Sequence, residues 1–202
     1  MRTLLWTGII LGPIFYGVVL AQILTRTGYD ISRQPLSLLA LGEAGWIQTA
    51  NFIIAGLLGL GLAASLFGID KGPSGFVAAA FITVFGVGII LAGLFPSDPS
   101  MGFPPGAPEG IPEVMSQAAK IHGLGFMISF SALTLAFTAF GFMFWADSRA
   151  VAIASFAMVV IIPVVIGAGM SRMDWASLAF FGAGALSFGW LTFVSYFLWK
   201  GN

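Results

Sequence analysis

Long uncharged runs alternate with short polar segments along the whole chain. Six such runs are bounded by charged residues, namely Arg2 and Arg26, Glu43 and Asp70, Lys71 and Asp98, Lys120 and Asp147, Arg149 and Arg172, and Asp174 and Lys200. Each is longer than the roughly 20 residues that an α-helix needs to cross a bilayer. The pattern predicts six transmembrane helices, at about 4–24, 45–68, 75–95, 113–145, 151–170 and 175–199.

Backbone groups in lipid must be hydrogen-bonded within the protein, so the alternatives are helices and closed β-barrels. A barrel would show alternating strands of about ten residues, and that pattern is absent. Of the 202 residues, 58% are hydrophobic and only 8% are charged, whereas about a quarter are charged in soluble domains. We therefore predict an all-α integral membrane protein, a six-helix bundle in one domain over residues 1–202. The first run is too long for the apolar part of a signal peptide, and we interpret it as a retained span.

Several classes of site are excluded by composition. The net charge is zero, with 8 basic and 8 acidic residues, so no surface for nucleic acid is expected. The absence of cysteine excludes disulfides and thiolate ligands, and a single histidine excludes a multi-histidine metal or haem site. No phosphate-binding loop of the form GxxxxGK[ST] occurs. We expect no metal and no cofactor.

Small residues recur within the runs at helical spacing. Gly8 and Gly12 lie four residues apart in the first run. This spacing places both on one helix face, where they permit the close approach of a neighbouring helix. We interpret this pair as a packing feature.

The longer connections, at about 25–44 and 97–118, fall on one side of the predicted bundle. Basic residues are divided equally, four on each side, so the positive-inside rule alone does not orient the chain. We give more weight to basic residues in the compact connections. This choice places both termini in the cytoplasm and the long connections outside.

Ionisable residues gather where the spans begin on this outer side. Charges at that depth are costly, and their default interpretation is functional. Asp30, Asp98 and His122 are the candidate catalytic or acid–base residues. Arg33 and Arg172 could hold a carboxylate or phosphate through their forked guanidinium groups. The pattern predicts an outward-facing polar pocket between the helices.

Ser32 and Asn51 complete the predicted ligand-binding set. Several of the candidates also have a structural interpretation. Asp98, next to Pro99, suits a turn that its own side chain would stabilise. Asn51 could hydrogen-bond to another helix, and His122 could serve only as a structural hydrogen-bonding group. The sequence leaves both interpretations open.

Short motifs occur in a recognisable order, as Tyr29-Asp30, Ser37-Leu38-Leu39-Ala40-Leu41-Gly42, Asn51-Phe52 with Gly56, Gly93-Leu94-Phe95-Pro96-Ser97-Asp98, and His122-Gly123. This order resembles a bacterial and archaeal family of six-helix membrane proteins known as domain of unknown function 998. The resemblance implies a prokaryotic cell-membrane protein, with Asp30, Asn51, Asp98 and His122 at the signature positions of the family. It implies no activity.

Three functions fit these observations. The leading hypothesis is a pocket that binds a lipid headgroup or small anionic ligand, with a lipid-modifying enzyme as an extension. The second is an accessory or scaffold subunit that binds other membrane proteins, or a second copy of itself, through faces rich in small residues and in the 20 phenylalanines. The third is a small-molecule transporter, which predicts polar residues continuing through the membrane midplane. Membrane lipids are the expected partner in the leading hypothesis.

Overall fold

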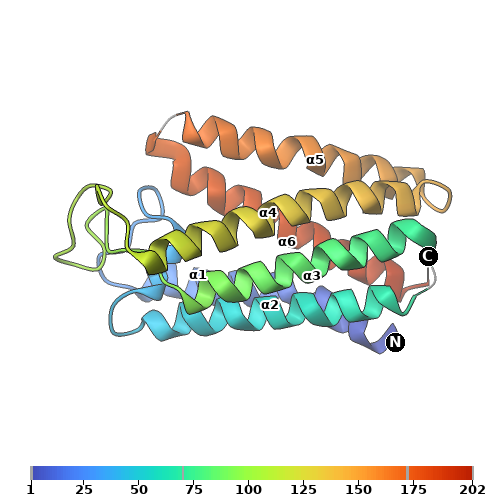
Figure 1. Cartoon of the computed structure of the whole chain (residues 1–202), viewed down its shortest axis with the longest axis horizontal. Coiled ribbons are helices and arrows are strands. Elements are labelled where there is room, and N and C mark those ends of the chain that lie inside the picture. The colour runs from blue at the N-terminus through green and yellow to red at the C-terminus, as the bar shows by residue number, and fades with distance from the viewer. Residues whose placement is uncertain (1, 70, 172, 202) are drawn as a thin grey trace.

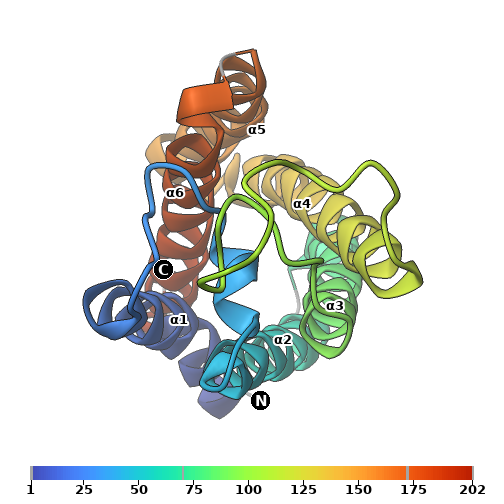
Figure 2. The same cartoon turned by 90° about the vertical axis from the view of Figure 1, so that its left-hand side faces the viewer.

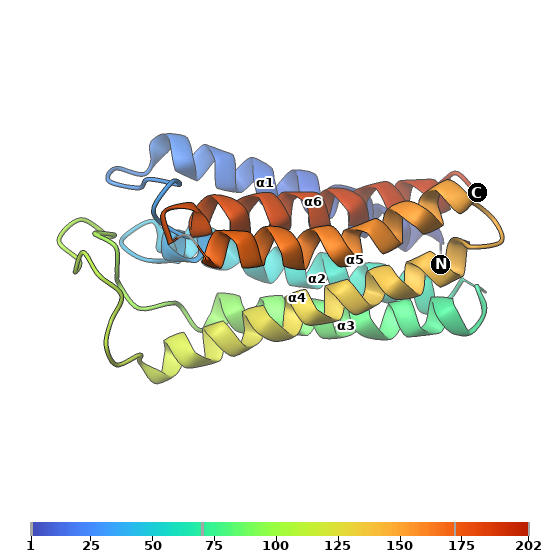
Figure 3. The same cartoon turned by 90° about the horizontal axis from the view of Figure 1, so that it is seen from above.

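A computed structural model describes residues 2–69, 71–171 and 173–201 as a bundle of long helices running along one axis (Figures 1 and 3). The helices are α1 (Leu5–Thr25), α2 (Gly45–Phe67), α3 (Gly72–Leu94), α4 (Gln117–Phe144), α5 (Arg149–Met170) and α6 (Met173–Trp199). All six are long and apolar enough to cross a membrane, which confirms the predicted fold class. The described residues also form two short 3-10 turns, η1 (Arg2–Leu4) and η2 (Leu36–Ala40).

The start of α4 differs from its predicted position. Hydrophobicity places it near residue 113, whereas the helix begins at Gln117. Ser116 is the N-cap, and its side chain accepts a hydrogen bond from the backbone N–H of Ala119 at 3.1 Å. Because this cap satisfies one of the free N–H groups of the first turn, the irregular segment extends to Ser116.

Neighbouring helices pack in chain order, and α6 closes the ring against α1. Glycines allow the closest approaches. A Cβ atom at Gly8 would overlap the Ser195 hydroxyl, and one at Gly12 would lie 3.0 Å from the carbonyl oxygen of Phe188. The predicted packing role of Gly8 and Gly12 is confirmed, with α6 as the partner helix.

The long connections lie together at one end of the bundle. The segments 26–44 and 95–116 occupy this end, while α1 begins and α6 ends at the opposite one (Figure 1). We call it the loop end. Figure 2 looks onto the loop end and shows both segments crossing the middle of the bundle. They therefore lie across this end of the bundle.

Candidate functional site

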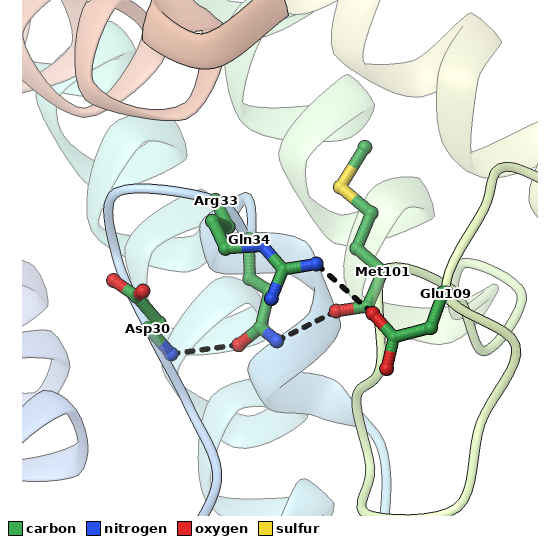
Figure 4. Close-up of polar contacts among 5 residues, drawn as sticks. All are labelled: Asp30, Arg33, Gln34, Met101 and Glu109. Atoms are coloured by element: carbon green, nitrogen blue, oxygen red, sulfur yellow. Dashed lines mark hydrogen bonds and ion pairs between the residues drawn. The ribbon is translucent and has the colours of Figure 1, made fainter.

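Gln34 joins the two segments of the loop end and is only 3% exposed. Its Nε2 donates to the carbonyl oxygen of Met101 at 2.8 Å, and its Oε1 accepts from the backbone N–H of Asp30 at 2.7 Å (Figure 4). The Tyr29 hydroxyl donates to the carbonyl oxygen of Gln34 at 2.7 Å. The bond to Met101 holds the segment 26–44 against the segment 95–116, and the other two stabilise the fold of the segment 26–44 around Gln34.

Arg26, directly after α1, is a second anchor of the loop end. Its guanidinium group donates to the carbonyl oxygens of Leu39 and Leu41, and lies 5.3 Å from the centre of the Phe103 ring. Burial lowers the pKa of Arg26, but an arginine side chain stays protonated in proteins. Because charge-assisted hydrogen bonds are the stronger ones, Arg26 holds η2 and Phe103 in place.

Three of the predicted site residues lie in the exposed part of the loop end. Asp30 Oδ1 accepts from the hydroxyl of Ser32 at 2.7 Å and from its backbone N–H at 2.9 Å. These hydrogen bonds lower the pKa of Asp30. Arg33 forms an ion pair with Glu109 at 3.0 Å (Figure 4), and the two side chains are 58% and 78% exposed. Arg33 therefore already has a carboxylate partner from the protein.

Asp98 bonds to the segment that leads into α4. Its carboxylate accepts from the backbone N–H of Ser116 at 2.8 Å. Hydrogen bonds from the side chain and backbone of Ser116 lower the pKa of Asp98. This contact gives Asp98 a structural role across the segment 95–116. Arg172 lies outside the described residues.

Asn51 belongs to a cluster of three buried amides between α1 and α2. Gln22 Nε2 donates to Gln48 Oε1 at 2.8 Å, and Asn51 Nδ2 donates to the carbonyl oxygen of Phe15 at 3.0 Å. Within the described part of the chain, Gln22 Oε1, Gln48 Nε2 and Asn51 Oδ1 have no hydrogen-bond partner. The predicted bond from Asn51 to another helix is confirmed. Gln22 was not among the predicted residues, although it could have been identified as an isolated polar residue inside the apolar span of α1.

A cavity of about 440 Å³ lies at the loop end, between α1, α2, α3, α4 and α6. Pro35, Leu36 and Ser37 line it from the segment 26–44, and Met115 lines it from the segment 95–116. Its walls are mainly aromatic, and include Phe15, Phe52, Phe126, Phe130, Phe180 and Phe188. Gly123 also lines the cavity, and a Cβ atom at this position would have no neighbour within 4 Å. The cavity is therefore apolar and has room beside Gly123.

Among the predicted site residues that the structure describes, His122 alone lines this cavity. Its Nδ1 lies 2.8 Å from the carbonyl oxygen of Ala92 and 3.0 Å from that of Phe95. The described ionisable side chains at the loop end form ion pairs, bond to neighbouring polar groups or are exposed to water. The lining of the cavity between the helices is therefore mainly aromatic. The structure thus has an aromatic cavity with one histidine where the sequence predicts a convergent polar pocket.

A family model described as "Protein of unknown function (DUF998)" matches residues 9–196. No curated protein matches the chain, and no solved structure matches it. The matched residues run from α1 to α6 and include the whole lining of the cavity.

Proposed function

We propose that the cavity of this chain, which belongs to the DUF998 family of proteins of unknown function, binds one membrane lipid by the lipid's apolar chain. The observation that carries the proposal is the aromatic cavity of about 440 Å³ at the loop end. Small-molecule sites typically have volumes of about 300–1,000 Å³ and mainly apolar walls. An apolar chain is the ligand that such walls favour.

The lining of the cavity favours the apolar chain of a lipid as its occupant over water or an ion. An apolar cavity of this kind offers water too few polar partners to be filled by it. No lysine, arginine, aspartate or glutamate is among its described lining residues, and burying an unpaired charge is costly. The single imidazole and the covering segments 26–44 and 95–116 would then face the lipid's head.

Binding from a bilayer gains little from the hydrophobic effect, because lipid tails are as apolar as the lining. The free energy of binding must come from contacts that the bilayer lacks. Packing against several aromatic rings is one source, and hydrogen bonding at the polar head is the other. The proposal therefore requires a lipid of suitable shape, and not any lipid of the membrane.

Filling the cavity tests the proposal directly. Gly123→Leu places a side chain into the open space beside Gly123, where it would occupy part of the cavity. Gly189→Leu is the matched control, because a Cβ atom added at Gly189 would also have no neighbour within 4 Å. Gly189 is an exposed residue of α6 and does not line the cavity. Both changes raise helix propensity by a similar amount, about 1 kcal/mol.

Native mass spectrometry of protein extracted in mild detergent gives the readout. We expect the wild-type protein and Gly189→Leu to retain a lipid of one mass class, and Gly123→Leu to have lost it. Equal lipid occupancy in Gly123→Leu would refute binding in this cavity.

We further propose that the protein lies in the cell membrane with both termini in the cytoplasm and the loop end outside. Because the chain has no cysteine, single cysteines can be placed at exposed positions at the two ends. We expect a membrane-impermeant maleimide to label Gly110→Cys on intact cells and to label Ala146→Cys only after lysis. The reverse pattern would invert the proposed orientation.

A further inference from the structure

We infer that the lipid held in the cavity has a neutral head that donates a hydrogen bond, such as the hydroxyl of a long-chain alcohol, and that His122 Nε2 accepts this bond. The inference rests on the proposed function and adds the chemical class of the ligand. The sequence predicts a lipid headgroup or small anionic ligand, with two arginines as candidates to hold a carboxylate or phosphate, whereas the head inferred here is neutral.

The proton on His122 is fixed by two carbonyl groups at the end of α3. In a regular helix, the carbonyl oxygens of Ala92 and Phe95 would accept from the residues four positions later. Those residues are Pro96 and Pro99, which have no N–H group. The carbonyls therefore need another donor, and His122 Nδ1 lies 2.8 Å and 3.0 Å from them.

Carbonyl oxygens only accept hydrogen bonds, so Nδ1 must carry the proton. In a neutral imidazole the other nitrogen, Nε2, is then an acceptor. In the described part of the chain, the hydrogen bonds of His122 all involve Nδ1, and no protein group donates to Nε2. Since the ring also lines the cavity and packs edge-on against Phe52, with 6.2 Å between ring centres, Nε2 is available to a ligand there.

The other polar groups of the lining do not favour an anion. The Tyr16 hydroxyl already donates to the carbonyl oxygen of Phe181 at 3.0 Å. The Ser37 hydroxyl also lines the cavity, but it is uncharged and cannot neutralise an anion. The described lining contains no lysine and no arginine, and the ion pair with Glu109 occupies Arg33. An anionic head would be buried without a countercharge, which is strongly unfavourable. A hydroxyl group needs only an acceptor, and His122 Nε2 provides one.

Nitrogen NMR can test the hydrogen bond directly at the accepting atom, His122 Nε2. His122 is the only histidine in the chain, so histidine labelled with ¹⁵N gives the signals of one ring without assignment. In lipid nanodiscs we expect Nδ1 to resonate as a protonated nitrogen and Nε2 as an unprotonated one. Titration with 1-dodecanol should shift Nε2 towards the protonated range, whereas dodecyl methyl ether, which has no donor, should leave it in place.

Affinity gives an independent readout with the same probes and with dodecanoate. At equal mole fractions in the membrane, dodecanol should bind about 2- to 10-fold more tightly than the ether, which is the range expected of one hydrogen bond. Dodecanoate should bind more weakly than both. His122→Asn keeps a donor near the position of Nδ1, but its acceptor Oδ1 lies near the position of the ring Cδ2 and does not reach that of Nε2. This variant should fold, bind the ether as before and lose the preference for the alcohol.

The outcomes separate the two proposals. If all three probes bind equally, or if both ring nitrogens are protonated and dodecanoate binds best, the neutral-donor inference is wrong while lipid binding stands. If none of the probes binds to the wild-type protein more tightly than to Gly123→Leu, both the inference and the proposed function are wrong.

Discussion

Replacing Arg26 by methionine should loosen the cover of the cavity. The change keeps an unbranched apolar side chain but removes every hydrogen bond that the guanidinium group donates to Leu39 and Leu41. It also removes the cation from the face of Phe103. The segment 26–44 would then be held chiefly by Gln34.

The structure gives the size of the effect. Hydrogen bonds to a charged group contribute about 1.5–3 kcal/mol each, and a cation over an aromatic ring contributes about 0.5–1 kcal/mol at an exposed site. Because Arg26 is only half-buried, water replaces part of the lost bonding. We therefore expect the local opening free energy of the segment to fall by about 2–4 kcal/mol.

Arg33→Met is the matched control, since it is the same substitution further along the same segment. Arg33 and its partner Glu109 are both largely exposed, and such ion pairs contribute about 0–1 kcal/mol. The two variants thus differ in the anchoring that they remove and not in the kind of side chain that they introduce.

Hydrogen–deuterium exchange of peptides covering η2 is the assay, because amide exchange reports local opening. Arg26→Met should exchange there about 30- to 1,000-fold faster than the wild-type protein, and Arg33→Met less than about tenfold faster. Equal exchange in the two variants would show that Arg26 does not anchor the cover.

Two further predictions concern helix packing and pH. Gly125→Ala should be less stable than Gly123→Ala by about 1–3 kcal/mol, as measured by SDS titration from mild detergent. The reason is that a Cβ atom at position 125 would lie 2.8 Å from the carbonyl oxygen of Gly88, whereas Gly123 has open space. Equal stabilities would contradict the tight contact of α3 with α4. The pKa of Asp98 is lowered by Ser116, so its bond to Ser116 stabilises the protein above the usual carboxyl pKa and is lost as the pH falls through the lowered value. The Ser116 amide signal should follow this acid titration in the wild-type protein and not in Asp98→Ala, and a titration that persists in the variant would assign it to another group.

The helices were predictable because apolar runs of this length have few structural alternatives in a membrane. The start of α4 was less predictable, since the Ser116 cap and not hydrophobicity sets it. The family was also predictable, because its short motifs span most of the chain, as the match over residues 9–196 confirms.

The cavity could not be predicted from the sequence. Its phenylalanines are indistinguishable in sequence from those that face lipid, so ionisable residues such as Arg33 were the predicted site. Arg33 lies in the exposed loop end, whereas Arg26 and Gln34, which were not among the predicted residues, organise the cover. Sequence position near a span indicates which side of the membrane a residue is on, but not whether it points between the helices.

A high-resolution structure of the protein in nanodiscs made from its native membrane would test lipid binding at this site most directly. We predict one elongated density in the cavity between Phe126, Phe180 and Phe188, with its polar end within hydrogen-bonding distance of His122 Nε2. A cavity closed by its own side chains, or one containing no elongated density, would contradict lipid binding there.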